Sequence, residues 1–170
     1  QIVRQSLDAR KKPALFYSYS VNVTVKKEEK VYKDACRRLG KANVLLTEKT
    51  EYLFPAEGST QQKHPTVIIG MGPAGLFCGY YLAQHGYAPV ILERGADVDA
   101  RQADVEAFWQ TGRLKPDSNV QFGEGGAGTF SDGKLNTLVK DKYGRNTEVL
   151  KTFVKHGADP AILYQAKPHI

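Results

Sequence analysis

Hydrophobic and polar positions mostly alternate between residues 14 and 25. The apolar face of this stretch consists of Leu15, Tyr17, Tyr19, Val21, Val23 and Val25. A period of two predicts a half-buried β-strand. From Glu28 to Leu39 the apolar positions recur at helical spacing instead, and Gly40 follows, so we expect a helix that ends there. The short apolar stretch from Thr50 to Phe54 is a further candidate strand.

These elements divide the chain into an N-terminal module and a second, larger part. Residues 1–56 are expected to form a small α+β module, too short to bury much core alone. The polar stretch 57–64 is expected to be a linker. Residues 65–170 would form a second domain with too few strands for a complete parallel sheet. We therefore expect the N-terminal part of a longer protein, whose C-terminal remainder would complete that domain.

The second part begins with a short apolar run, residues 67–69, that leads directly into a glycine motif. The motif is Gly70-x-Gly72-x-x-Gly75, and a helical pattern follows it. Gly70 would permit a tight turn, Gly72 would let a pyrophosphate approach the backbone, and Gly75 would let the helix pack closely on the strand. The helix would open at Pro73 and Ala74, where its free N–H groups could bind phosphate.

An acidic residue, Glu93, follows a second apolar run at residues 90–92. It comes after the glycines at close to the spacing of about 20 residues that a ribose-binding acid has in dinucleotide-binding βαβ units. A carboxylate suits a ribose 2′-hydroxyl and disfavours NADP. Arg94 could meet a 2′-phosphate, or it could lie solvated beside the adenine. The pattern predicts a Rossmann-like α/β fold and leaves the choice between NAD and FAD open.

A second glycine-rich segment covers residues 118–135. Its glycines are Gly123, Gly125, Gly126, Gly128 and Gly133. Such a segment must approach a ligand closely or adopt positive φ repeatedly, and a flat ring or a phosphate chain would be its natural occupant. A flexible linker is the alternative, which the embedded Phe122 and Phe130 disfavour. The candidate ligand-binding positions in this loop are Gly125, Gly126, Ala127, Gly128 and Thr129.

Further helices are expected after Glu93. The first covers 97–110, with Val98, Val105, Phe108 and Trp109 on one stripe and Gly112 behind it. The second covers 146–156 with Asn146 as its N-cap, and Asp159-Pro160 opens a short helical turn.

Several of these segments together resemble a bacterial family described as uncharacterised FAD-dependent proteins, or NAD(FAD)-utilising dehydrogenases. The segments are 6–10, 68–75, 93–95, 118–135 and 162–170, and the resemblance covers nearly the whole chain. It implies FAD bound in a glutathione-reductase-like fold and implies no substrate. In related two-dinucleotide flavoproteins an arginine soon after the acid can reach the pyrophosphate, so Arg101 is a candidate ligand. Its alternative role is an exposed helix charge.

The leading hypothesis is therefore an FAD-dependent oxidoreductase that acts on an unknown small molecule, with NAD(P)H as a candidate electron donor. No residue looks like a dedicated acid, base or nucleophile, so we assign no catalytic residue. An NAD-dependent dehydrogenase without flavin is the first alternative. A non-enzymatic nucleotide- or flavin-binding module, contacting RNA or a partner through a basic face, is the second.

Charge and composition limit the partners, the metals and the cellular environment expected for this protein. The net charge of +6 arises entirely within residues 1–63. No aromatic platform or nucleic-acid signature accompanies it, so a solvated face is favoured and no nucleic-acid partner is expected. The two cysteines lack CxxC spacing, which favours a reduced, cytoplasmic environment. The four histidines lack ligand spacing, so no metal is assigned, and no apolar run is long enough for a membrane span.

Overall fold

The computed structural model describes residues 1–48, 50–56, 58–137 and 139–170. The chain divides into two units, one made of residues 1–54 and 134–170 and the other of residues 55–133. The first boundary lies beside the expected linker, whose residue 57 is outside the described residues. The expected domain over 65–170 needs correction, because residues 134–170 group with the N-terminal residues.

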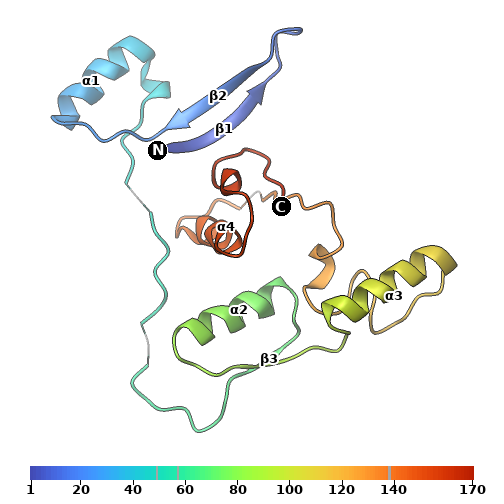
Figure 1. Ribbon diagram of the computed structural model, residues 1–170. Helices are drawn as coiled ribbons and strands as arrows, with labels where there is room; N and C mark the ends of the chain where they lie inside the picture. Colours follow the sequence, from blue (N-terminus) through green and yellow to red (C-terminus); the bar gives the residue numbers. More distant parts are fainter. Residues whose placement is uncertain (49, 57, 138) are drawn as a thin grey trace. The chain divides into compact units, whose positions relative to one another are not determined.

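Unit one contains an antiparallel hairpin of β1, Ile2–Asp8, and β2, Phe16–Val21 (Figure 1). The alternation in the sequence predicted the second strand and missed the first. The expectation of a half-buried strand is wrong, because every residue of β2 is exposed and Tyr17 keeps 63% of its surface. Two paired strands satisfy each other's backbone and leave both side-chain faces open.

The first helix, α1, covers Glu28–Leu39, as the periodicity predicted. Gly40 follows with a positive φ of +86°, and its N–H donates to the Cys36 carbonyl at 3.0 Å. A 3₁₀ turn, Lys41–Asn43, comes next. The strand expected at residues 50–54 is absent from the described structure. Five residues are too few for local preference alone to specify a strand.

The C-terminal part of unit one holds α4, Arg145–Lys155, and a 3₁₀ turn, Pro160–Leu163. The Asp159 carboxylate accepts from the Ala161 N–H at 2.8 Å, which confirms the expected start of that turn. The expected N-cap of α4 is wrong: Gly144 precedes the helix with φ 73°. Asn146 lies inside the first turn, where its N–H donates to the Asp141 carboxylate at 2.8 Å.

The C-terminal segment lies along the edge of β1, which explains why it belongs to unit one. The Gln5 N–H donates to the Tyr164 carbonyl at 2.7 Å, and the Ala166 N–H donates to the Gln5 carbonyl at 2.9 Å. The Leu135 N–H also donates to the Pro168 carbonyl at 2.9 Å. These backbone bonds tie residues 134–170 to the hairpin.

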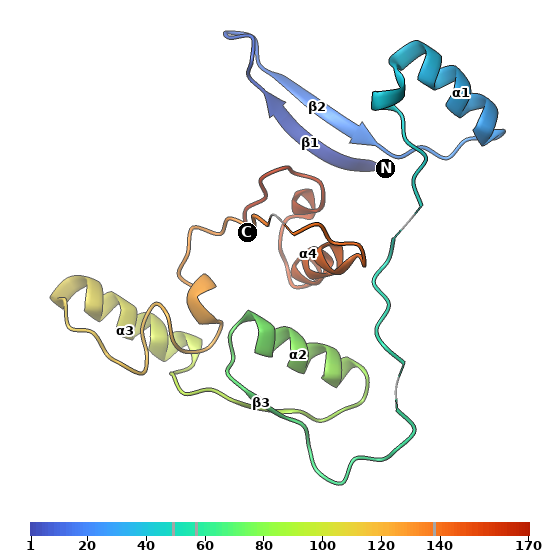
Figure 2. The ribbon, with the colours of Figure 1, turned by 180° about the vertical axis from the view of Figure 1, so that it is seen from behind.

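Unit two begins with the strand–helix–strand order that the sequence predicted. β3, Val67–Ile69, pairs in parallel with β4, Val90–Leu92. The helix α2, Pro73–Gln84, follows β3 along the chain and connects the two strands (Figure 2). Helix and strands pack closely, because a Cβ at Gly79 would lie only 2.7 Å from Ile91 Cδ1. A side chain at this position would require the end of the Ile91 side chain to move.

The next helix, α3, covers Val98–Thr111 and is capped at both ends. The Asp97 carboxylate accepts from the Ala100 N–H at 2.9 Å, and Gly112 ends the helix with φ 70°. The buried face of α3 differs from the expected stripe, because Val98 and Trp109 are exposed. Val105 is buried as expected, and Arg101, which lies four residues before it on the same face, is buried as well. No helix among the described residues is long and apolar enough to cross a membrane.

Candidate functional site

The turn between β3 and α2 has the geometry that the glycine motif predicted. Gly70 adopts φ +92°, which L side chains rarely adopt, and its N–H donates to the Leu92 carbonyl at 2.7 Å. A Cβ at Gly75 would collide with the Gly70 carbonyl oxygen. The two glycines therefore allow the helix to start directly against the strand ends.

Glu93, directly after β4, is attached to this turn. Its Oε2 accepts from the Met71 N–H at 2.6 Å, and its Oε1 accepts from the Gly95 N–H at 2.9 Å. These backbone donors, that of Gly95 first and that of Met71 second, hold the pKa of the carboxyl below its ordinary value. The carboxylate is therefore charged at neutral pH, and its position relative to the glycine turn is fixed.

The start of α2 presents unused backbone donors. Across the described part of the chain, no acceptor is present for the N–H groups of Gly72, Ala74 and Gly75. They stand at the positive end of the helix, where an anion is favoured. A Cβ at Gly72 would meet only Gly126 Cα, at 4.0 Å, which is an ordinary contact distance, so the glycine-rich loop lies beside these donors. Unused backbone donors at a helix start are the kind of group that binds phosphate.

The second glycine-rich segment folds onto the first. The Gly125 N–H donates to the Met71 carbonyl at 2.9 Å. Gly126 adopts φ +69°, and a Cβ there would lie 3.0 Å from Pro73 Cδ and 3.1 Å from Gly72 Cα. The sequence predicted two separate glycine motifs. The structure brings the two motifs together, with Gly126 of the second lying against Gly72 of the first.

This loop also contributes an unused donor. A 3₁₀ turn, Gly126–Gly128, begins beside the contact with Pro73. Within the described residues, the Ala127 N–H has no acceptor. Donors from two chain segments therefore lie at neighbouring positions, at the start of α2 and at the start of this turn.

Arg101 lies beneath the loop and not on the helix surface. Its side chain is 0% exposed, so an exposed helix charge is excluded. The guanidinium donates from Nε to the Asn119 carbonyl at 2.8 Å and from Nη1 to the Glu124 carbonyl at 2.6 Å. Phe130 stacks on it, with its ring centroid 4.9 Å from Cζ. Burial lowers the pKa of this guanidinium, and the negative charge of Glu93 opposes that shift.

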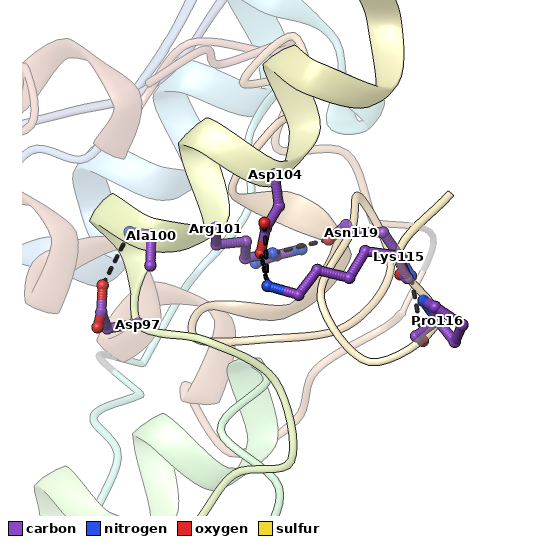
Figure 3. Close-up of polar contacts among 7 residues, drawn as sticks. All are labelled: Asp97, Ala100, Arg101, Asp104, Lys115, Pro116 and Asn119. Carbon is purple, nitrogen blue, oxygen red and sulfur yellow. Dashed lines mark hydrogen bonds and ion pairs between the residues drawn. The ribbon is translucent and has the colours of Figure 1, made fainter. Parts of the chain in front are cut away.

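Polar contacts with α3 hold residues 115–119, which lead into the glycine-rich loop (Figure 3). Lys115 pairs with Asp104 at 2.8 Å, and this hydrogen bond is the main cause that lowers the pKa of the Asp104 carboxyl. The Asn119 side chain donates to the Lys115 carbonyl at 2.8 Å. The approach to the glycine-rich loop is therefore anchored to α3 before the loop reaches Arg101.

The Arg94 side chain contacts the same part of the chain. Its guanidinium lies 4.5 Å from the centroid of the Phe122 ring and 3.7 Å from Asp117 Oδ1. Its side chain remains 62% exposed. Both of its predicted roles, contact with a phosphate and solvation beside an adenine, stay predictions.

Every site residue predicted from the sequence lies in unit two, and the structure groups most of them around the β3–α2 turn. Met71, Asn119 and Glu124 were not predicted from the sequence, and each of them contributes a backbone carbonyl or N–H to these contacts. Glu124 also accepts the Val98 N–H at 2.8 Å through its carboxylate, at the start of α3. Contacts made by backbone atoms do not require a particular type of residue, so the sequence does not reveal them. Across the described residues, no cluster of three or more His, Cys, Asp or Glu side chains could hold a metal.

No family model matches the chain. Comparison with individual proteins does find similar sequences. An "Uncharacterized protein" of Clostridium beijerinckii is 45% identical over 169 residues, which cover 99% of this chain and 31% of that protein. The chain thus spans about a third of that relative's length. Proteins named "Putative oxidoreductase YgfK" in Escherichia coli K12 and O157:H7 are 49% identical over 35 residues, 21% of this chain and 3% of each of them.

Proposed function

We propose that this chain carries the ADP-binding part of an FAD-dependent oxidoreductase with a Rossmann-like fold. The observation that carries the proposal is the union of the two glycine segments around unused backbone donors, with Glu93 attached to the same turn by the Met71 N–H. Backbone donors at a helix start suit a pyrophosphate, and an acid at the end of the next strand suits a ribose.

In this proposal each group has one task. The N–H groups of Gly72, Ala74 and Gly75 bind the pyrophosphate. Glu93 accepts a ribose hydroxyl through lone pairs that its two backbone donors leave free. Bound FAD would supply the electron-transfer chemistry, and the chain would fix the position of its nucleotide half. The loop at Gly125–Thr129 would line the path toward the flavin.

The comparisons support the coarser part of this proposal. The matched stretch of 35 residues belongs to proteins whose name includes the word oxidoreductase. The choice of flavin over nicotinamide rests on the glycine-rich loop and on the family resemblance of the sequence.

A titration of the full natural polypeptide that contains this chain tests the proposal. After the protein has been stripped of bound cofactor, calorimetry with ADP, FAD and NAD compares the three ligands. We expect stoichiometric binding of ADP and tighter binding of FAD. Tighter binding of NAD than of FAD would indicate a flavin-free dehydrogenase. No binding of ADP at millimolar concentration would contradict the site itself.

A second measurement separates an enzyme from a binding module. The FAD-loaded protein is mixed anaerobically with NADH or NADPH, and the visible absorbance of the flavin is followed. Bleaching at a rate that saturates with nucleotide supports an oxidoreductase with a nicotinamide donor. Absence of bleaching with either nucleotide would count against that electron donor.

A further inference from the structure

Arg101 is the largest fully buried side chain among the described residues. It lies on α3, in unit two, and every contact described for its side chain is with the segment between residues 119 and 130. Burying an arginine is costly unless its N–H donors form hydrogen bonds. The groups that accept these hydrogen bonds therefore indicate the role of Arg101.

The guanidinium joins two carbonyls of the chain that lie on either side of Gly123. Nε donates to the Asn119 carbonyl at 2.8 Å, and Nη1 donates to the Glu124 carbonyl at 2.6 Å. The guanidinium also lies over the ring of Phe130. Gly123 adopts φ +119°, and a Cβ there would lie 2.6 Å from Arg101 Cδ. The loop is thus shaped closely around this one side chain.

The next residue along the chain makes the contact with the phosphate-binding turn. Glu124, whose carbonyl Arg101 binds, is followed by Gly125, whose N–H donates to the Met71 carbonyl at 2.9 Å. Gly126 then lies against Gly72 and Pro73. Fixing the Glu124 carbonyl therefore fixes the two glycines that close over the turn.

We propose that Arg101 is a positioning residue that holds Gly125 and Gly126 against the turn at Met71–Pro73 without contacting the bound nucleotide. This inference rests on the proposed function. Its remaining donor, Nη2, is buried and has no partner among the described residues. A ligand therefore reaches that atom only if the loop moves away. Lysine cannot replace the arginine, because one ammonium does not reproduce the planar fork that meets two carbonyls.

The test uses R101K and R101M in the full natural polypeptide, with R113M as the control, since Arg113 is exposed just after α3. Hydrogen exchange is measured on the cofactor-free protein, and ADP affinity is measured by calorimetry. We expect amides of residues 119–129 to exchange about tenfold faster or more in both Arg101 variants, while α2 is unchanged. The ADP affinity should fall roughly ten- to a hundredfold, the equivalent of one or two charge-assisted hydrogen bonds. R113M should match the wild type in both measurements.

Two results would overturn the inference. Unchanged exchange in the cofactor-free protein together with lost ADP affinity would show that Arg101 binds the nucleotide directly. Equal acceleration in α2 and in residues 119–129 would show a general loss of stability. If the wild type binds no ADP, the proposed function fails, and the exchange arm still decides whether Arg101 positions the loop.

Discussion

The Glu93 carboxylate accepts a hydrogen bond from the Met71 N–H at 2.6 Å, which fixes the acid after β4 against the turn after β3. The Met71 carbonyl in turn accepts from the Gly125 N–H at 2.9 Å. One peptide region thus connects the acid, the first glycine motif and the second.

The charge of Glu93 makes the stability of unit two depend on pH. Because its pKa is lower in the folded state, its stabilising contribution is complete above the ordinary value of 4.5 and is lost as the pH falls through the folded value. The E93Q variant should show a flatter stability profile between neutral and acid pH than the wild type. Urea unfolding followed by fluorescence measures this, since the one tryptophan, Trp109, lies in unit two. Identical profiles would contradict the bonding of Glu93 described here.

Gly126 should tolerate no side chain. Alanine would need both a left-handed backbone at φ +69° and a shift of Pro73, whose Cδ would lie 3.0 Å from the new Cβ. We expect G126A to lower the free energy of unfolding of unit two by about 1–3 kcal/mol. G128A is the matched control for stability, because a Cβ there meets nothing within 4 Å. It should change stability by less than about 0.5 kcal/mol. Equal effects of the two substitutions would count against the packing of the glycine segments.

Gly72 separates binding from folding. A Cβ at this position has only Gly126 Cα at 4.0 Å, an ordinary contact distance, so G72A should fold with nearly wild-type stability. The same Cβ would occupy space that we assign to the pyrophosphate. We expect ADP affinity to fall about tenfold or more in G72A, and to be abolished in G72V. Calorimetry on both variants decides, and full affinity in G72V would place the phosphates elsewhere.

The start of α3 depends on Asp97, whose carboxylate accepts the Ala100 N–H at 2.9 Å. Removing an N-cap of this kind costs about 1 kcal/mol, so D97A should lower the unfolding free energy of unit two by roughly that amount. D99A is a suitable control, because Asp99 lies in the same first turn and is exposed. It should cost less, through the helix dipole alone. The prediction fails if D99A destabilises the unit more than D97A.

The local pattern of apolar residues and glycines predicted those helices and strands that a short stretch of sequence specifies by itself. The helix at Glu28–Leu39 followed from its periodicity and from Gly40, and the β3–α2–β4 order followed from two apolar runs around a glycine motif. The first strand, β1, was missed because its register is set by its partner β2. Its pattern alone, Ile2–Asp8, does not separate a core face from a solvent face.

The site was only partly predictable for a related reason. Glycines and an acid carry a recognisable spacing, which placed Gly70, Gly72, Gly75 and Glu93. Arg101 is buried because residues 119–130 fold back over it. The spacing of residues along α3 does not predict that contact. Asn146 shows the same limit at a helix start, because Asp141 accepts its N–H while Gly144 takes the cap position.

The most direct test of the central claim is to identify what the full natural polypeptide carries when it is purified. The protein is denatured, and the released small molecules are identified by mass spectrometry and by their absorbance spectrum. The account predicts FAD at close to one molecule per chain for the wild type and a large loss in G72V. Release of a different cofactor, or of no adenine dinucleotide from a folded protein that also fails to take up added FAD, would contradict it.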